Sequence, residues 1–260
     1  MKITNPIALR RLQNFRKNRR GYISFWIFLF LLGLTLPAEF IANDKPIVVS
    51  FQGKIFFPIF KEYKETEFGG VFKTEADYTD PFVIKKIESQ GWMINPMVPF
   101  DHQTVSWNLT MPAPSAPDSI HILGTDDQAR DVLARVIYGF RISVIFGFTL
   151  TIVSAVIGIF AGALQGYFGG WVDLIGQRFI EIWSGMPTLY LLIILASIIE
   201  PNFWWLLGLL LLFSWMGFVG VVRAEFLRAR NFDYVRAARA LGLGDFKIML
   251  RHVLPNALVA

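Results

Sequence analysis

The chain has 260 residues, of which 54% are hydrophobic and 17% are charged, and its mean hydropathy is +0.46. This composition is too apolar for a soluble domain of this length, so we expect lipid to be the solvent for much of the chain. The sequence contains no cysteine, which excludes disulfide bonds, thiolate metal sites and a cysteine nucleophile.

Four stretches lack acidic and basic side chains and are long enough to cross a hydrocarbon core, which takes roughly 20 helical residues. They cover residues 21–38, 142–172, 182–199 and 202–222. We therefore predict four transmembrane helices, the first of which occupies domain 21–41. No small-residue cleavage site follows it, so we expect it to stay as an anchor and not to be removed as a signal peptide.

Two basic segments orient the predicted spans of this chain, whose net charge is +5. One is the tail at residues 1–20, which holds no acidic residue, and the other follows the fourth span. Because Lys and Arg collect on the cytoplasmic side, both ends are expected in the cytoplasm, as an even number of crossings requires. The tail lacks interleaved aromatic and base-reading residues, so a topology signal with lipid headgroup contact is favoured over nucleic-acid binding.

Residues 42–119 form an extracytoplasmic insert between the first two predicted spans. Its early part predicts a β-hairpin, in which residues 47–51 and 54–57 pair across Gln52 and Gly53, because glycine supplies the positive φ of a tight turn. The prolines within residues 112–117 cannot hold helix or central strand and predict a stiff linker back to the membrane. The predicted fold class is an all-α multi-span membrane protein with a small, irregular, β-containing insert.

A helix is predicted to start shortly after residue 120, where Thr125 and Gln128 have the spacing of a capping box. Asp126 favours the positive end of this helix, and Asp131 stands four residues before Arg135, in the order that suits an ion pair. We expect an amphipathic helix along the outer membrane surface, an interpretation favoured over a gating element. Helix capping also explains these carboxylates better than a metal site does.

No pattern for catalysis or for energy coupling occurs in the sequence. It contains neither a G-x-S-x-G nucleophile turn nor a G-x-x-x-x-G-K-[ST] phosphate loop, and the predicted spans lack the buried charged groups that ion-coupled transporters use. We therefore expect no catalytic residue, no metal and no cofactor. Small residues in the second span favour close helix packing over pore lining. They are Gly147, Ser154, Ala155, Gly158, Ala161, Gly162 and Gly166.

Residues 223–255 follow the fourth predicted span and predict two short cytoplasmic helices that meet at a glycine. One face of the first helix carries Tyr234, Ala237, Ala238 and Leu241. Gly242 ends this helix, Asp245 is predicted to cap the second, and Pro255 is predicted to end it. From periodicity alone, a helix on the membrane surface is as good an interpretation as docking to a soluble partner.

This segment resembles the cytoplasmic loop E-A-A-x3-G-x9-I-x-L-P of bacterial ABC importer permeases. The matching residues are Ala237, Ala238, Gly242, Leu254 and Pro255. Arg236 stands where the family has Glu, and His252 stands where it has Ile, although Arg251 to Ala257 is similar to the dipeptide and oligopeptide branch.

Further segments resemble the C-type permease subunit of that branch. They are residues 123–126, which include Thr125 and Asp126, residues 130–133, which begin with Arg130 and Asp131, and residues 138–143 and 166–170. The insert and residues 223–228 look like the microcin C and oligopeptide uptake subtype.

The resemblance implies a six-span permease subunit of the bacterial inner membrane, with its core at residues 120–260 and a continuation beyond Ala260. It also implies a homologous second permease, cytoplasmic ATPase subunits that hydrolyse ATP, and a periplasmic peptide-binding protein as partners. Residues 223–255 would couple the spans to the ATPase. The coupling residues would be Asp233, Tyr234, Arg236, Ala237, Ala238, Leu241, Gly242, Asp245, His252, Leu254 and Pro255. An ion-coupled transporter or channel and a membrane-anchored assembly protein are the alternatives.

Overall fold

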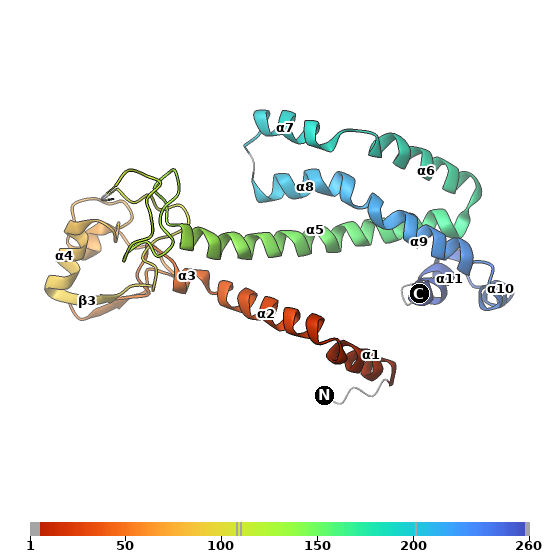
Figure 1. The fold of residues 1–260 in the computed structure, drawn as a ribbon, viewed down its shortest axis with the longest axis horizontal. Helices are drawn as coiled ribbons and strands as arrows, with labels where there is room; N and C mark the ends of the chain where they lie inside the picture. The colour runs from red at the N-terminus through yellow and green to blue at the C-terminus, as the bar shows by residue number, and fades with distance from the viewer. Residues whose placement is uncertain (1–5, 108, 110, 201, 258–260) are drawn as a thin grey trace. The chain divides into compact units, whose positions relative to one another are not determined.

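The structure is a computed structural model that describes residues 6–107, 109, 111–200 and 202–257. The chain divides into two compact units, Met1–Val144 and Ile145–Ala260 (Figure 1). The apolar run that the sequence places at residues 256–260 lies partly outside the described residues.

The first unit begins with three helices, α1 (Pro6–Lys17), α2 (Arg19–Thr35) and α3 (Ala38–Ile41). Asn18 caps α2, because its side chain accepts the Gly21 N–H at 3.2 Å. Pro37, which has no N–H to donate, separates α2 from α3. The first predicted span corresponds to α2, which has 17 residues; that it crosses the membrane stays a prediction.

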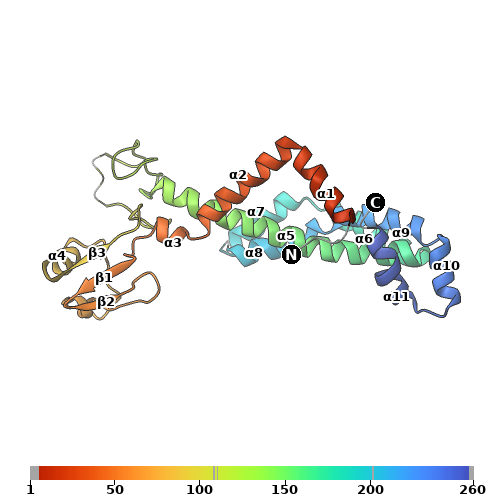
Figure 2. The ribbon, with the colours of Figure 1, turned by 90° about the horizontal axis from the view of Figure 1, so that it is seen from below.

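The insert is a three-stranded antiparallel sheet with one face covered (Figure 2). β1 (Val48–Phe51) pairs with β2 (Lys54–Phe56) across Gln52 and Gly53, whose φ angles are 50° and 75°, so the predicted hairpin is confirmed. β3 (Gly91–Ile94), which the pattern did not predict, pairs with the other edge of β1. η1 (Glu65–Phe68) and α4 (Pro81–Gln90) supply Phe68, Val83 and Ile87 to the core on the inner face.

The loop before the next helix differs from its prediction. The Thr125 hydroxyl pairs with Ser115 instead of capping a helix, and the Thr125 N–H donates to Ser115 O at 3.1 Å, which ties down the proline-containing run. The cap is Asp131, whose Oδ1 accepts the Ala134 N–H at 2.8 Å. The predicted capping box is therefore wrong.

The charged residues of this loop also pair differently from the prediction. Asp126 accepts hydrogen bonds from the N–H groups of Gln128 and Arg130, both at 2.9 Å, and forms ion pairs with Arg130 and Arg135. Arg135 thus pairs with Asp126 and not with Asp131. Asp131 is fully buried, and its Oδ2 lies 2.9 Å from His121 Nδ1. Although burial alone would raise the pKa of Asp126, the Arg130 and Gln128 donors lower it to about 2.

α5 (Val132–Phe168) is one continuous helix of 37 residues. The expected surface helix is not separate from the span, because nothing between residues 132 and 142 breaks the helix. Gly139 lies within it, and a Cβ there would meet no atom within 4 Å. At a rise of about 1.5 Å per residue, α5 is roughly 55 Å long, more than a hydrocarbon core requires. It ends at Phe168, before the predicted limit of residue 172, because Gly169 and Gly170 adopt φ angles of 65° and 53°.

The second unit continues with α6 (Gly170–Ser184), α7 (Thr188–Ile198), α8 (Phe203–Ser214) and α9 (Met216–Ala229). In the part of the chain that is described, Val132–Phe168 and Phe203–Ala229 are long and apolar enough to cross a membrane. The span predicted at 182–199 is broken, since Gly185 and Pro187 separate α6 from α7 and the two helices are bent by 63°. The bent pair would be a third span if counted as one.

The segment after α9, which the sequence predicts to be cytoplasmic, consists of α10 (Asp233–Ala240), α11 (Asp245–Ile248), the π-helical η2 (Met249–Val253) and α12 (Leu254–Ala257). Pro255 does not end the second helix as predicted. The wider π turn just before Pro255 accommodates a residue that lacks an N–H, so the helix continues to Ala257. Asp245 is the first helical residue and makes no cap bond, so the predicted cap at Asp245 is wrong.

Candidate functional site

Three glycines let α5 and α9 approach closely next to the segment that follows α9. Gly158, Gly162 and Gly166 recur every four residues and therefore lie on one face of α5. A Cβ at these positions would lie 2.4, 2.8 and 2.5 Å from the backbone oxygens of Trp215, Val219 and Arg223, respectively. This contact confirms the packing interpretation for these glycines and makes α5 and α9 a tightly packed support.

An ion pair fastens α6 to the same support. The Arg223 guanidinium on α9 donates to Asp173 on α6, with Nη2 at 2.7 Å from Oδ2 and a second bond through Nε. A two-point contact between guanidinium and carboxylate fixes the orientation of both groups. Three helices of the second unit are therefore joined where their apolar stretches end.

The short helices of the segment that follows α9 pack on this support through a shared core. We call α10, α11 and η2 together the knee, residues 233–253. Its buried side chains are Val235, Ala238, Ile248, Met249 and Val253, and they pack with Ala163, Tyr167, Phe226 and Ala229 of α5 and α9. The two limbs of the knee, α10 on one side and α11 with η2 on the other, therefore share one packed core with α5 and α9.

A polar contact adds to this core. The Tyr167 hydroxyl at the end of α5 donates to Asp245 Oδ1 at 2.7 Å, and the Tyr167 ring is itself buried. The Arg239 guanidinium lies over that ring at 5.1 Å and stands 3.7 Å from Asp245. Tyr167 thus contacts a residue of each limb and holds the knee closed.

The bend of the knee is set by a left-handed glycine. Gly242 has a φ of 76°, its N–H donates to Arg239 O at 2.9 Å, and the Leu243 N–H donates to Ala238 O at 3.2 Å. These two bonds form the Schellman arrangement that closes an α-helix. The prediction that Gly242 ends the first helix is confirmed, and a side chain at this position would be strained.

The knee carries three large apolar side chains that the described chain leaves more than half exposed. Leu241 is 81% exposed, Phe246 is 57% exposed and Leu250 is 51% exposed, and we call these three residues the knee surface. Isolated exposed apolar residues are common, but three large ones on the two limbs of a short polar segment are typical of a docking surface.

The predicted contact face of the first helix is divided by the structure. Ala238 is buried in the core of the chain itself, and Tyr234 is half-buried against that core, whereas Ala237 and Leu241 are exposed. The helix packs inward through Val235 and Ala238, three residues apart, which turns Ala237 and Leu241 outward. A partner can therefore touch Ala237 and Leu241 but not Ala238.

The remaining predicted site residues fall into two groups. In the segment that follows α9, Asp233, Arg236, Gly242 and Pro255 are exposed, while His252 is half-buried and Leu254 packs on the core. Thr125, Asp126, Arg130 and Asp131 belong to the loop of the other unit. Sequence reasoning did not predict the contact of Tyr167 with the knee. Its signals for Tyr167 were a polar aromatic residue at the end of an apolar run and the family-like segment 166–170.

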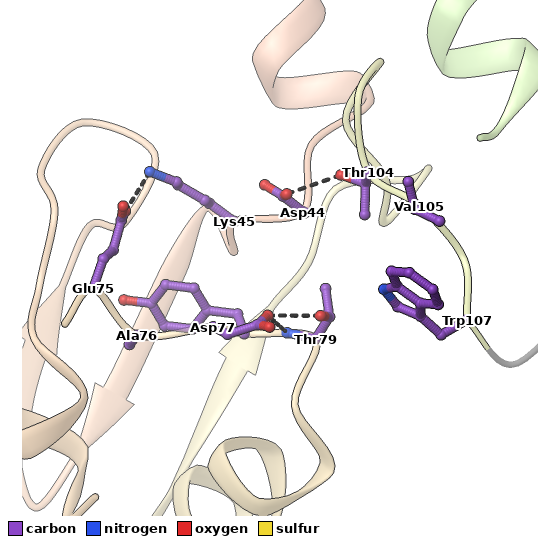
Figure 3. Close-up of a pocket in the computed structure, with 10 residues that line it drawn as sticks. Asp44, Lys45, Glu75, Ala76, Asp77, Thr79, Thr104, Val105 and Trp107 are labelled. Carbon is purple, nitrogen blue, oxygen red and sulfur yellow. Dashed lines mark hydrogen bonds and ion pairs between the residues drawn. The ribbon is translucent and has the colours of Figure 1, made fainter. Parts of the chain in front are cut away.

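The insert contains a cavity of about 350 Å³ whose polar groups are largely paired among themselves (Figure 3). Lys45 pairs with Glu75, Asp77 accepts from the Thr79 N–H at 2.8 Å, and the Thr104 hydroxyl donates to Asp44 at 2.9 Å. Burial raises the pKa of Asp44. Within the described residues, no group of three or more His, Cys, Asp or Glu could hold a metal ion.

The chain matches one family model and is similar to known transport permeases. The family model for the binding-protein-dependent transport system inner membrane component matches residues 154–260. The chain is 56% identical over 280 residues to the peptidoglycan transport system permease protein YejE of Agrobacterium fabrum, covering 98% of this chain and 73% of that protein. It is 55% identical over 256 residues to the inner membrane ABC transporter permease protein YejE of Escherichia coli, and this match covers 98% of the present chain and 75% of that relative. It is 33% identical over 177 residues to the oligopeptide transport system permease protein OppC of Haemophilus influenzae, and this match covers 68% of the present chain and 55% of that relative.

Proposed function

The chain belongs to the family of binding-protein-dependent transport system inner membrane components, and from this premise we propose that it is a permease subunit for the ATP-driven import of peptides. As a permease subunit of this family it lies in the inner membrane and is a non-enzymatic component of an ABC transporter. ATP hydrolysis would take place in cytoplasmic partner subunits. The other proposed partners are a homologous second permease and a periplasmic peptide-binding protein.

The observation that carries the coupling proposal is the contrast between the two sides of the knee. Its inner side is fixed to α5 and α9 by the buried core and by the Tyr167–Asp245 hydrogen bond. Its outer side presents the knee surface, which the described chain leaves more than half exposed, although the Phe246 ring also meets the Phe168 ring of α5 at 6.3 Å. Docking of this surface in a groove of the ATPase would bury Leu and Phe side chains, each worth about 1.5–3 kcal/mol when fully buried.

Transport would then follow from the rigidity of this connection. When ATP draws the two ATPase subunits together, their grooves carry the knee with them. Because the knee shares one core with α5 and α9, those helices tilt, and the pathway between the permease subunits opens toward the other side of the membrane. The chain itself supplies a lever and part of the pathway, while the energy comes from its partners.

The names of the relatives support the peptide cargo. Relatives of this chain are named as permeases for oligopeptides, dipeptides and peptidoglycan. We propose oligopeptides as the cargo class, with peptide conjugates of the microcin C type as the narrower candidate. Competition assays with an oligopeptide, with microcin C and with a peptidoglycan-derived peptide separate these cargoes, and failure of all three to inhibit uptake would contradict the peptide proposal.

The coupling proposal is tested by crosslinking. Because the sequence contains no cysteine, Leu241→Cys places a single thiol on the knee surface without any background. Val71→Cys is the matched control, since Val71 is 82% exposed but lies in the extracytoplasmic insert. We expect Leu241→Cys, and not Val71→Cys, to capture a cytoplasmic ATPase subunit in native membranes.

The same experiment separates the alternatives. An ion-coupled transporter or channel would give no ATPase adduct, and a membrane-anchored assembly protein would give an adduct that does not hydrolyse ATP in response to peptide. Ala237→Trp supplies a functional test, since it adds bulk on the exposed side of α10 without touching the buried core. Normal peptide-stimulated ATP hydrolysis and normal uptake in Ala237→Trp would contradict docking at the knee surface.

The orientation of the chain is part of the proposal. A cytoplasmic N-terminus, an extracytoplasmic insert and a cytoplasmic knee are consistent with the basic residues at 1–20 and 223–255. We further propose the insert as the docking surface of the binding protein, because it is the largest structured part of the chain outside the predicted spans. Deletion of residues 44–119 without loss of uptake would remove that assignment.

A further inference from the structure

A turn on the surface of the insert is apolar where turns are ordinarily polar. After β2, the chain passes through Phe57, Pro58, Ile59 and Phe60, and the turn is closed by the Phe60 N–H, which donates to Phe57 O at 3.0 Å. Phe57 is 46% exposed and Phe60 is 73% exposed. Two exposed phenylalanines in one four-residue turn are unfavourable in water and indicate a contact surface.

Contacts in the first unit fix the level of this turn relative to the apolar helices. Arg141 is the last charged residue before the uninterrupted apolar part of α5. Its guanidinium binds both carboxylate oxygens of Glu39, at 2.8 and 2.9 Å, and also donates to Leu36 O at 3.2 Å. Leu36 directly follows α2, so the apolar parts of α2 and α5 end at the same level, and the ion pair marks the edge of the hydrocarbon.

The apolar turn reaches that level. Phe40 follows Glu39 in α3, and its ring meets the Phe60 ring edge to face, with the centroids 5.7 Å apart. Both rings are exposed on their other sides. Lys61 comes directly after the turn and places its ammonium over the Tyr63 ring at 5.4 Å. Aromatic rings flanked by a lysine are the usual composition of a protein surface at the headgroup level of a membrane.

We propose that Phe40, Phe57 and Phe60 form a lipid seat, by which the insert rests in the outer interface of the membrane that α5 crosses. The surface is continuous with a membrane-embedded part of the chain, since Phe40 is one residue from the ion pair that marks the hydrocarbon edge. Lipid is therefore the occupant that the geometry favours over a protein partner. The seat holds the insert against the bilayer and limits the directions from which a periplasmic partner can approach. This inference does not depend on the cargo or on the ATPase.

Single-cysteine variants test the lipid seat directly, because the chain has no cysteine of its own. Phe60→Cys and Phe57→Cys place a nitroxide label on the seat, and Lys54→Cys places the label on the same hairpin at an exposed position next to its turn. The full chain is reconstituted in vesicles of phosphatidylethanolamine and phosphatidylglycerol. Spin-label relaxation then reports collisions with oxygen, which concentrates in lipid, and with a water-soluble nickel chelate.

We expect the label at residue 60 to collide several-fold more with oxygen and several-fold less with the nickel chelate than the label at residue 54. The label at residue 57 should show the same shift, which guards against a local effect of one substitution. Collision rates at residues 57 and 60 that match those at residue 54 would overturn the proposal, because they would place the turn in water. Shielding of both labels from both reagents would also overturn it, because a protein surface and not lipid would then cover the seat.

Discussion

Substitution of Gly166 by alanine measures how closely α5 and α9 must pack. A Cβ at residue 166 would lie 2.5 Å from Arg223 O and 2.6 Å from Phe226 Cβ, closer than side-chain carbons approach such atoms. Neither neighbour is the flexible end of a long side chain, so the two helices must move apart. Overpacking of this kind costs about 1–3 kcal/mol. The cost exceeds the roughly 0.5–1 kcal/mol that alanine gains over glycine inside a helix.

Gly147→Ala is the matched control for Gly166→Ala. Gly147 also lies in the α5 portion of the second unit, but a Cβ there would meet nothing within 4 Å. We therefore expect Gly147→Ala to be neutral or slightly stabilising and Gly166→Ala to lower the free energy of unfolding. The two values are measured by titration of the purified chain in mixed micelles, followed by circular dichroism.

The functional consequence of Gly166→Ala follows from its neighbour. Phe226 is fully buried in the core that fixes the knee, so a separation of α5 from α9 displaces that core. We expect fewer peptides imported per ATP hydrolysed, with membrane insertion unchanged. Equal unfolding free energies for Gly166→Ala and Gly147→Ala would refute the reasoning, because they would mean that the close contact between the helices carries no energetic cost.

Three further predictions follow from the knee and from the loop before α5. Gly242→Val should uncouple ATP hydrolysis from uptake, because valine at a φ of 76° costs at least about 1–2 kcal/mol. The control Gly244→Val, at a φ of −68°, should be tolerated in the same assay. Tyr167→Phe keeps the ring but removes the hydrogen bond to Asp245. It should lower the free energy of unfolding by about 0.5–1.5 kcal/mol and reduce the ratio of peptide uptake to ATP hydrolysis. An unchanged ratio would show that the bond has no part in coupling. The lowered pKa of Asp126, about 2, should stabilise the folded loop at every pH above the unfolded value of about 3.9, and this stabilisation should disappear as the pH falls through 2; a carboxyl NMR titration with a midpoint near 4 would contradict it.

The sequence predicted the features that depend on local pattern. The hairpin at Gln52 and Gly53 and the helix end at Gly242 were both correct, because positive φ angles select glycine or a neighbouring turn residue directly. The apolar helices were located by hydropathy, since hydrocarbon tolerates few charged side chains. The family resemblance rested on similarly local motifs.

Features that depend on contacts between distant residues could not be predicted. Thr125 has the spacing of a capping residue, but its hydroxyl is taken by Ser115, and Asp131 becomes the cap because His121 holds its other oxygen. The sequence also predicted an ion pair between Asp131 and Arg135, but Arg135 pairs with Asp126 of the preceding loop. At Ala238, periodicity defined a contact face, but only the positions of α5 and α9 determine which part of that face is buried.

The break between α6 and α7 has a consequence for what surrounds it. The Trp183 indole N–H donates to Leu212 O at 2.9 Å, so the break at residues 185–187 stands level with the middle of the apolar run that begins at Asn202. The N–H groups of Gly185 and Met186 donate to Glu181 O and Trp183 O at 3.2 Å, but Pro187 has no N–H and the first N–H groups of α7 have no intrahelical acceptor, which is unfavourable in hydrocarbon. Lipid acyl chains are therefore excluded from the break between α6 and α7. In the assembled transporter it must face another subunit or a water-filled passage, as discontinuous helices do where they border the route of a cargo.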